Sequence, residues 1–170
     1  MADPRSPHSP GAASALVIDA DFLLADPGRE AARKHVQVGI EGGRIAAIND
    51  AAPGTSSSAC RRLILPALAN AHDHARTFRS ATLGAFARPL EGWLPFLGVT
   101  PPADPYLGAA TSFARSVRHG VSHLMVHYTR VQGSLPYVDE AEAVARAARD
   151  VGVNIGFAVA ITDRHATGSA

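Results

Sequence analysis

The sequence contains two histidines separated by one residue, His72 and His74, whose side-chain type and spacing could support metal binding. They follow an apolar segment that is typical of a strand. Residues two apart on a strand point to the same side, so both imidazoles would project together while Asp73 faces the other side. Two neutral imidazoles about one strand repeat apart can chelate a divalent ion such as zinc or iron. From the tripeptide alone, a pair of solvated loop histidines is an equal alternative.

Composition limits the class of protein that carries this pair. With 46% hydrophobic residues among 170, the chain can bury a core, which predicts a globular protein. Its 16 basic and 15 acidic residues are spread along the sequence without a basic stripe, so we expect no nucleic-acid partner. One cysteine excludes a cysteine-rich zinc site. We find no secretory signal and no run of ~18 apolar residues, so we expect a cytoplasmic protein without membrane contact.

The first third of the chain reads as a β-rich region behind a disordered tail. Residues 1–14 are rich in proline and form the expected tail. The glycine pair Gly42-Gly43 predicts a tight hairpin, because glycine readily adopts positive φ angles. Short apolar runs predict strands at 15–18, 22–24, 35–40 and 45–48.

The apolar segment that leads to the histidines reads as a strand buried on both faces of a parallel sheet. Pro66 interrupts it, because proline cannot donate a ladder hydrogen bond. We therefore expect Leu63 to Leu65 to end one small sheet and Ala67 to Ala71 to begin the next.

Beyond residue 103 the hydrophobic period changes to that of helices. Asp104 is a candidate N-cap for a helix that begins at Pro105 and terminates at Gly120. The expected elements that follow are a strand over 121–128, a helix from 137 that stops at 152, and a strand over 153–161. Alternating strands and helices predict a parallel α/β unit, and either a doubly wound sheet or the opening of a (β/α)8 barrel fits.

Three segments in this order resemble a known family. They are the glycine hairpin Glu41 to Ile45, the proline-containing strand Leu65 to Ala71, and the His-x-His motif His72-Asp73-His74. Together they resemble the amidohydrolase superfamily, in particular its cytosine deaminase-like and triazine hydrolase-like branch, from about Ala15 to the end of the chain. A later stretch, Arg118 to Ser122, resembles the family's glycine turn into its second barrel strand.

The resemblance implies a fold, which we state as an expectation. It is a partial (β/α)8 TIM barrel, of which residues 67–170 supply the first three strands. Residues 15–66 would form a small β-rich subdomain, half of a β-sandwich. Because such a barrel needs about 250 residues, we expect the chain to be the N-terminal portion of the enzyme.

The resemblance also implies an activity. A metal-activated water would hydrolyse or deaminate a C–N bond other than a peptide bond, in a small amide, amidine or nitrogen heterocycle. His72 and His74 would bind zinc or iron, with one or two ions present, while the general base and remaining ligands would come from later strands. This portion alone should bind metal weakly and lack useful activity. Homo-oligomerisation of the full-length protein is left open.

Four further residues are candidates for a substrate pocket. Arg76 and Trp93 lie in the long connection from Ala75 to Ala103, and loops of that length are often functional. His127 and Asp163 lie near the ends of the second and third expected strands, where barrel pockets form. The alternatives are core packing for Trp93 and capping or solvation of loop ends for the others.

Two other functional classes remain open. The chain could be a catalytically inactive fragment or interaction module of the same fold, since unpaired sheet edges recruit other chains. It could also be a small doubly wound domain whose histidine pair is incidental.

Overall fold

The computed structural model describes residues 15–55, 60–76, 80–84, 86–87, 89–98, 100–131 and 134–159. The expected tail and Asp163 lie outside these ranges. Contacts divide the chain into two compact units, Met1–Pro66 and Ala67–Ala170, each with its own sheet. The chain is therefore a mixed α/β protein. Among the described helices, none is both long and apolar enough to cross a membrane.

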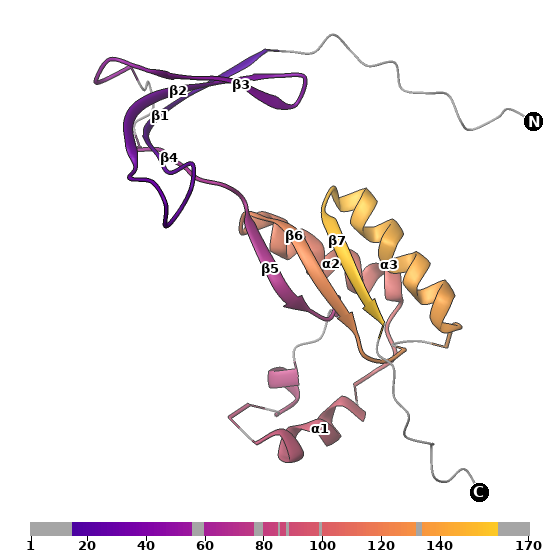
Figure 1. Ribbon diagram of the computed structural model, residues 1–170. Coiled ribbons are helices and arrows are strands. Elements are labelled where there is room, and N and C mark those ends of the chain that lie inside the picture. Colours follow the sequence, from indigo (N-terminus) through magenta and orange to yellow (C-terminus); the bar gives the residue numbers. More distant parts are fainter. Residues whose placement is uncertain are drawn as a thin grey trace, which may run out of the picture. The chain divides into compact units, whose positions relative to one another are not determined.

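The first unit is a four-stranded sheet in the order β3-β2-β1-β4 (Figure 1). Strands β1, β2 and β3 are antiparallel neighbours, and β4 pairs parallel to β1. Ala20, Leu23 and Val36 form its small core. The strand bounds are β1 Leu16–Leu23, β2 Arg33–Glu41, β3 Arg44–Asp50 and β4 Leu63–Ile64.

The glycine hairpin is confirmed, and one strand prediction is corrected. Gly42 and Gly43 connect β2 to β3 with φ angles of 56° and 75°. The runs expected at 15–18 and 22–24 belong to one continuous strand, β1. The polar residues between them keep partners in the sheet: Gln37 Nε2 donates to Asp19 at 3.0 Å, and Arg62 N donates to Asp21 at 2.7 Å.

The second unit is a parallel three-stranded sheet in the order β5-β6-β7. Helices α2 and α3 cover one face of it, and α1 lies beyond the carboxyl end of the strands (Figure 1). The bounds are β5 Leu68–Asp73, the 3-10 helix η1 Ser80–Leu83, α1 Leu90–Gly98, α2 Pro105–Arg118, β6 Val121–Tyr128, α3 Tyr137–Val151 and β7 Asn154–Val159.

A core between the two helices and the sheet holds the second unit together. Phe113 of α2, Val126 of β6 and Val144 of α3 are all completely buried in it. The buried Tyr128 hydroxyl donates a 2.6 Å hydrogen bond to the equally buried Glu140 carboxylate. A buried carboxylate without such a donor would be strongly destabilising, so this bond lets α3 begin against the sheet.

The expectation that the first parallel strand is buried on both faces is wrong for the described chain. Leu68 in β5 is 52% exposed, and Met125 in β6 is 41% exposed. The helices cover one face of the sheet, and nothing in the described part of the second unit covers the other. The apolar sequence of the first parallel strand therefore indicates a sheet face that only a further layer of structure would bury.

The helix ends follow the sequence signals. Leu107 N donates to Asp104 Oδ1 at 2.8 Å, so Asp104 caps α2. Gly120 and Gly152 follow α2 and α3 with φ angles of 81° and 79°. The strand expected over 121–128 is β6, with identical bounds.

The connection from Ala75 to Ala103, read as a long loop, contains η1 and α1. Pro95 lies inside α1, and proline normally counts against a helix because it lacks the N–H. The helix begins as Gly92 N and Trp93 N donate to the Pro89 carbonyl at 2.9 and 3.2 Å. The apolar spacing of Leu90, Trp93 and Leu94 was a helical signal that the prolines masked.

Gly152 offers a test of the backbone argument. Replacing Gly152 by Ala is expected to destabilise the second unit by about 1–2 kcal/mol, because a Cβ disfavours the left-handed conformation. Nothing lies within 4 Å of the added Cβ, so steric contact adds nothing. Urea denaturation followed by helical circular dichroism measures the change. Gly98→Ala, also without a neighbour within 4 Å and without positive φ, is the control and should be near neutral.

Candidate metal site and adjoining pocket

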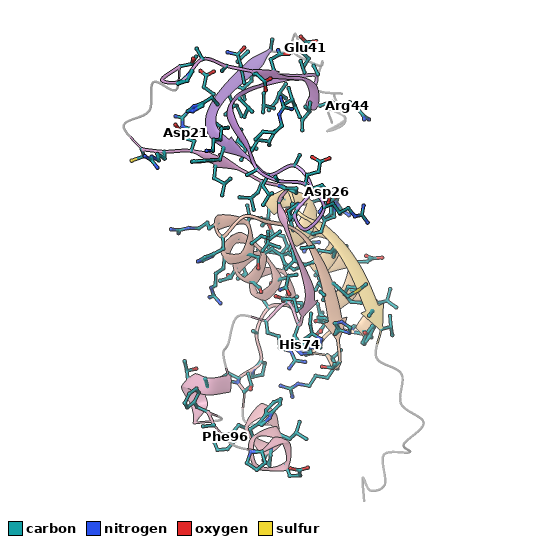
Figure 2. The ribbon with its side chains drawn as sticks, turned by 60° about the vertical axis from the view of Figure 1, so that its left-hand side comes forward. Asp21, Asp26, Glu41, Arg44, His74 and Phe96 are labelled. Atoms are coloured by element: carbon teal, nitrogen blue, oxygen red, sulfur yellow. The ribbon has the colours of Figure 1, made fainter. Side chains whose placement is uncertain are left out.

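The two histidines of the motif meet at the end of β5. His72 is the fifth residue of β5, and His74 directly follows the strand. Their Nε2 atoms lie 3.2 Å apart, and their rings are edge to face with centroids 4.9 Å apart. His72 is exposed and His74 is partly buried. Figure 2 shows His74 at the carboxyl end of the second unit's sheet.

Asp73 shapes the turn between them and faces away from the rings. Its Oδ1 accepts a 2.7 Å hydrogen bond from Ala75 N and a longer one, 3.4 Å, from Ser112 of α2. Asn70 Nδ2 donates to Asp73 Oδ2 at 3.1 Å, while Asn70 Oδ1 accepts from His72 N at 3.1 Å. A side chain that binds the backbone two residues onward stabilises a turn. Asn70 and Asp73 therefore fix the backbone that presents both imidazoles.

The backbone of the next strand selects the tautomer of the neutral His74 ring. His74 Nδ1 lies 2.7 Å from the carbonyl oxygen of His127. Because a carbonyl only accepts, Nδ1 must carry the proton, and the neutral ring then has its lone pair on Nε2. A carbonyl in this position is the usual outer partner of a metal-binding histidine. His74 thus directs the lone pair of its Nε2 toward His72 Nε2.

The spacing of the two nitrogens fits a tetrahedral metal ion. With Zn–N bonds of about 2.0–2.1 Å, two tetrahedral ligands lie about 3.3–3.4 Å apart. The observed 3.2 Å also suits a hydrogen bond from His72 Nε2–H to His74 Nε2. Within the described residues, no group of three or more His, Cys, Asp or Glu is arranged to hold a metal ion. The pair can therefore supply two ligands, and others must complete the coordination.

His127 lies against the pair and does not point at it. Its ring stacks on that of His72 with centroids 4.4 Å apart and an interplanar angle of 22°. Its Nε2 is 3.4 Å from the carbonyl oxygen of Ala71, at the limit of a hydrogen bond. His127 is thus placed to hold the ring of His72 in position.

A pocket of about 1330 Å³ adjoins His74 within the second unit. Its lining includes three residues singled out from the sequence, His74, Arg76 and Trp93. His72 and His127 do not line it. Asp163 lies outside the described residues.

The pocket also has lining residues that the sequence did not reveal, namely Arg115, Thr129 and Arg130. Thr129 and Arg130 immediately follow β6, and the carboxyl end of a parallel strand was the available signal for them. Arg115 lies in the last turn of α2, and nothing in its local sequence indicates a pocket.

Arg76 is a partly buried charged group of the pocket wall. Its Nη2 donates to Thr129 Oγ1 at 2.9 Å. Its Nε is buried and has no hydrogen-bond partner among the described residues. Burial lowers the pKa of Arg76 from its ordinary value, and the positive charge of Arg130 lowers it further. The structure therefore keeps two like charges together at the pocket wall.

Comparisons with known proteins find likeness in structure only. No family model matches the chain, and no curated protein does. A mutant atrazine chlorohydrolase from Arthrobacter aurescens TC1, complexed with zinc and atraton, matches at TM-score 0.52 and 19% identity over 83% of this chain and 34% of that one. A triazine hydrolase variant matches at TM-score 0.59 and 16% identity over 85% and 35% of the two chains.

These comparisons establish the fold likeness and its extent. At such identities a match shows the fold alone, and at that level the resemblance to triazine hydrolase-like enzymes is confirmed. The chain spans about a third of the length of the solved structures that it matches.

Proposed function

We propose that this chain is the N-terminal portion of a metal-dependent hydrolase of C–N bonds other than peptide bonds, with His72 and His74 as two of its metal ligands. The observation that carries the proposal is the 3.2 Å approach of their Nε2 atoms, with Nδ1 of His74 engaged by a backbone carbonyl. Solved structures with this fold, named an atrazine chlorohydrolase complexed with zinc and atraton and a triazine hydrolase, support a metal-dependent hydrolase.

The proposed architecture places the pair at the mouth of a barrel. Residues 67–170 supply the first three strands of a (β/α)8 barrel, and residues 15–66 supply half of a β-sandwich. The consecutive strand order, the parallel pairing and the helices on one face support this reading. The uncovered face, to which Met125 contributes, would be the barrel interior.

In the mechanism, His72 and His74 would hold a zinc or iron ion, which would lower the pKa of a bound water to about 7. Residues of this chain orient the imidazoles that would bind the ion. His74 offers Nε2 because its Nδ1 proton is held by the His127 carbonyl, and Asp73 maintains the turn. Arg76 and Trp93 contact a small amide, amidine or nitrogen heterocycle in the pocket, where hydrolysis or deamination occurs. The general base and remaining ligands come from outside the described residues.

One observation favours a second candidate, an inactive fragment or interaction module of the same fold. Large apolar side chains of the sheet are exposed: Leu68 by 52%, Met125 by 41% and Val159 by 56%. Such a surface recruits a complementary segment. Metal binding by the histidine pair does not depend on whether such a segment binds.

Zinc titration followed by NMR of the imidazole signals tests the proposal. We expect one zinc ion per chain to shift the His72 and His74 signals and to leave the exposed His119 unchanged. The reason is that only the first two have nitrogens at ligand spacing, while His119 Nδ1 is engaged by the Arg115 carbonyl at 2.7 Å. Equal shifts at all histidines, or none at the pair, would contradict a metal site here.

A further inference from the structure

We propose that the pocket beside His74 binds the carboxylate of a small planar ligand on the guanidinium of Arg76. The role of that ligand as a substrate rests on the proposed function. The binding itself depends on the arginines and the pocket alone, so it can be tested without a metal ion.

The charge of the pocket wall is the first argument. Arg76, Arg115 and Arg130 all line the pocket. Its two acidic lining residues are engaged elsewhere: Asp73 accepts from Ala75 N and Ser112, and Asp104 accepts from Leu107 N. Among the described residues, neither forms an ion pair with Arg76. With three arginines and two aspartates in its lining, the pocket carries a net formal charge of +1, which favours an anion over a neutral ligand.

The hydrogen bonding of Arg76 is the second argument. Thr129 takes one N–H of the guanidinium, and Nε is closed off from solvent without a partner. A buried donor left unpaired is unfavourable, and it calls for an explanation in a folded protein. Carboxylates match the planar fork of arginine with two charge-assisted hydrogen bonds. Because Arg76 lines the pocket and Thr129 takes only one of its N–H groups, a carboxylate there would give the guanidinium a charge-assisted acceptor.

The rest of the lining indicates a flat, partly apolar ligand. Trp93, Leu94 and Leu135 line the same pocket as Arg76. Its volume of about 1330 Å³ is ample for a small organic molecule. An aromatic or heterocyclic ring can lie against these side chains while its carboxylate reaches the arginine.

Benzoate and its neutral analogue benzamide provide a matched test. Trp93 is the chain's one tryptophan, so intrinsic fluorescence reports on this pocket directly. With a chelator present to remove metal, we expect benzoate to change the fluorescence saturably and to bind roughly tenfold or more tightly than benzamide. Equal binding of the two, or no saturable change with benzoate, would overturn the proposal.

Variants that each remove one positive charge test whether benzoate binds at Arg76. Arg76→Gln should weaken benzoate binding by roughly tenfold or more and leave benzamide unaffected. Arg118→Gln removes the same charge from an exposed position of α2 outside this pocket and should change neither. Unaltered benzoate binding by Arg76→Gln refutes the site. If that variant does not fold, as judged by circular dichroism, Arg76→Lys takes its place: it keeps the positive charge but loses the planar fork, and it should still bind benzoate more weakly than the wild type.

The outcome is separable from that of the metal proposal. A His72→Ala variant, which removes a proposed metal ligand that does not line the pocket, is expected to retain the preference for benzoate over benzamide to within a fewfold, because Arg76 remains. Loss of that preference in the His72→Ala variant would show that the histidine pair, and not the arginine, holds the anion, and would overturn the assignment to Arg76.

Discussion

Removal of both imidazoles, in the double variant His72→Ala and His74→Ala, is expected to abolish the binding of one zinc ion per chain. No group of three or more ligand-type residues within the described ranges is arranged to replace the pair. Loss of a group that only orients a ligand already weakens metal binding about 10–100-fold. Loss of two direct ligands should therefore weaken it by more than about 100-fold, as measured by competition with a chromophoric chelator.

The matched control removes two imidazoles that lie apart from the pair. His119 and His123 are exposed, and their Nδ1 atoms contact the Arg115 carbonyl and the Ser122 hydroxyl. The double variant His119→Ala and His123→Ala should retain the wild-type zinc affinity within a fewfold. Equal losses in the two double variants would mean nonspecific binding by histidines. Full retention after loss of His72 and His74 would mean that the 3.2 Å contact is only a hydrogen bond.

Helices and strands whose ends are determined by residues close to them in the chain could be predicted from the sequence. Asp104 caps α2 because its carboxylate reaches the N–H three residues onward, and that geometry depends on nothing distant. The hairpin at Gly42 and Gly43 depends likewise on the φ angles that glycine permits. By contrast, α1 was missed because Pro95 breaks the pattern, while the first turn and the apolar spacing still favour a helix.

The parts of the site that could not be predicted depend on contacts between distant residues. The bond that orients His74 comes from His127, 53 positions later, and it uses a backbone carbonyl that any residue could supply. The side chain of His127, which was the predicted functional group, instead stacks on His72. The residue types identified the histidine pair from the sequence. The register of β5 against β6 decides which atoms of β6 face that pair.

The proposed metal pair and the proposed anion site share one residue. His74 takes part in the pair through Nε2 and also lines the pocket that contains Arg76. Arg76 follows it by two positions, after the turn that Asp73 stabilises. A ligand held by Arg76 would therefore lie next to an imidazole of the pair. This adjacency is why a bound carboxylate would position a neighbouring C–N bond for attack.

A core substitution beneath the site has the largest expected effect on stability. Phe113→Ala is expected to destabilise the second unit by about 3–5 kcal/mol, through lost burial and the cavity that remains. Phe113 is completely buried in the cluster that joins α2 and α3 to β6. Since domains are commonly stable by about 5–15 kcal/mol, this loss would remove a large fraction of the total. Urea denaturation followed by helical circular dichroism reports on this unit, because every described helix lies in it.

Leu107→Ala, on the same helix, separates core packing from helix propensity. Leu107 is 62% exposed, so its truncation removes little buried surface, and alanine is a strong helix former. Its expected effect is within about 0.5 kcal/mol of zero. If Phe113→Ala were as mild, α2 would not pack on the sheet as described. The strands would then lack the support that holds the end of β5, and with it the histidine pair, in a fixed position.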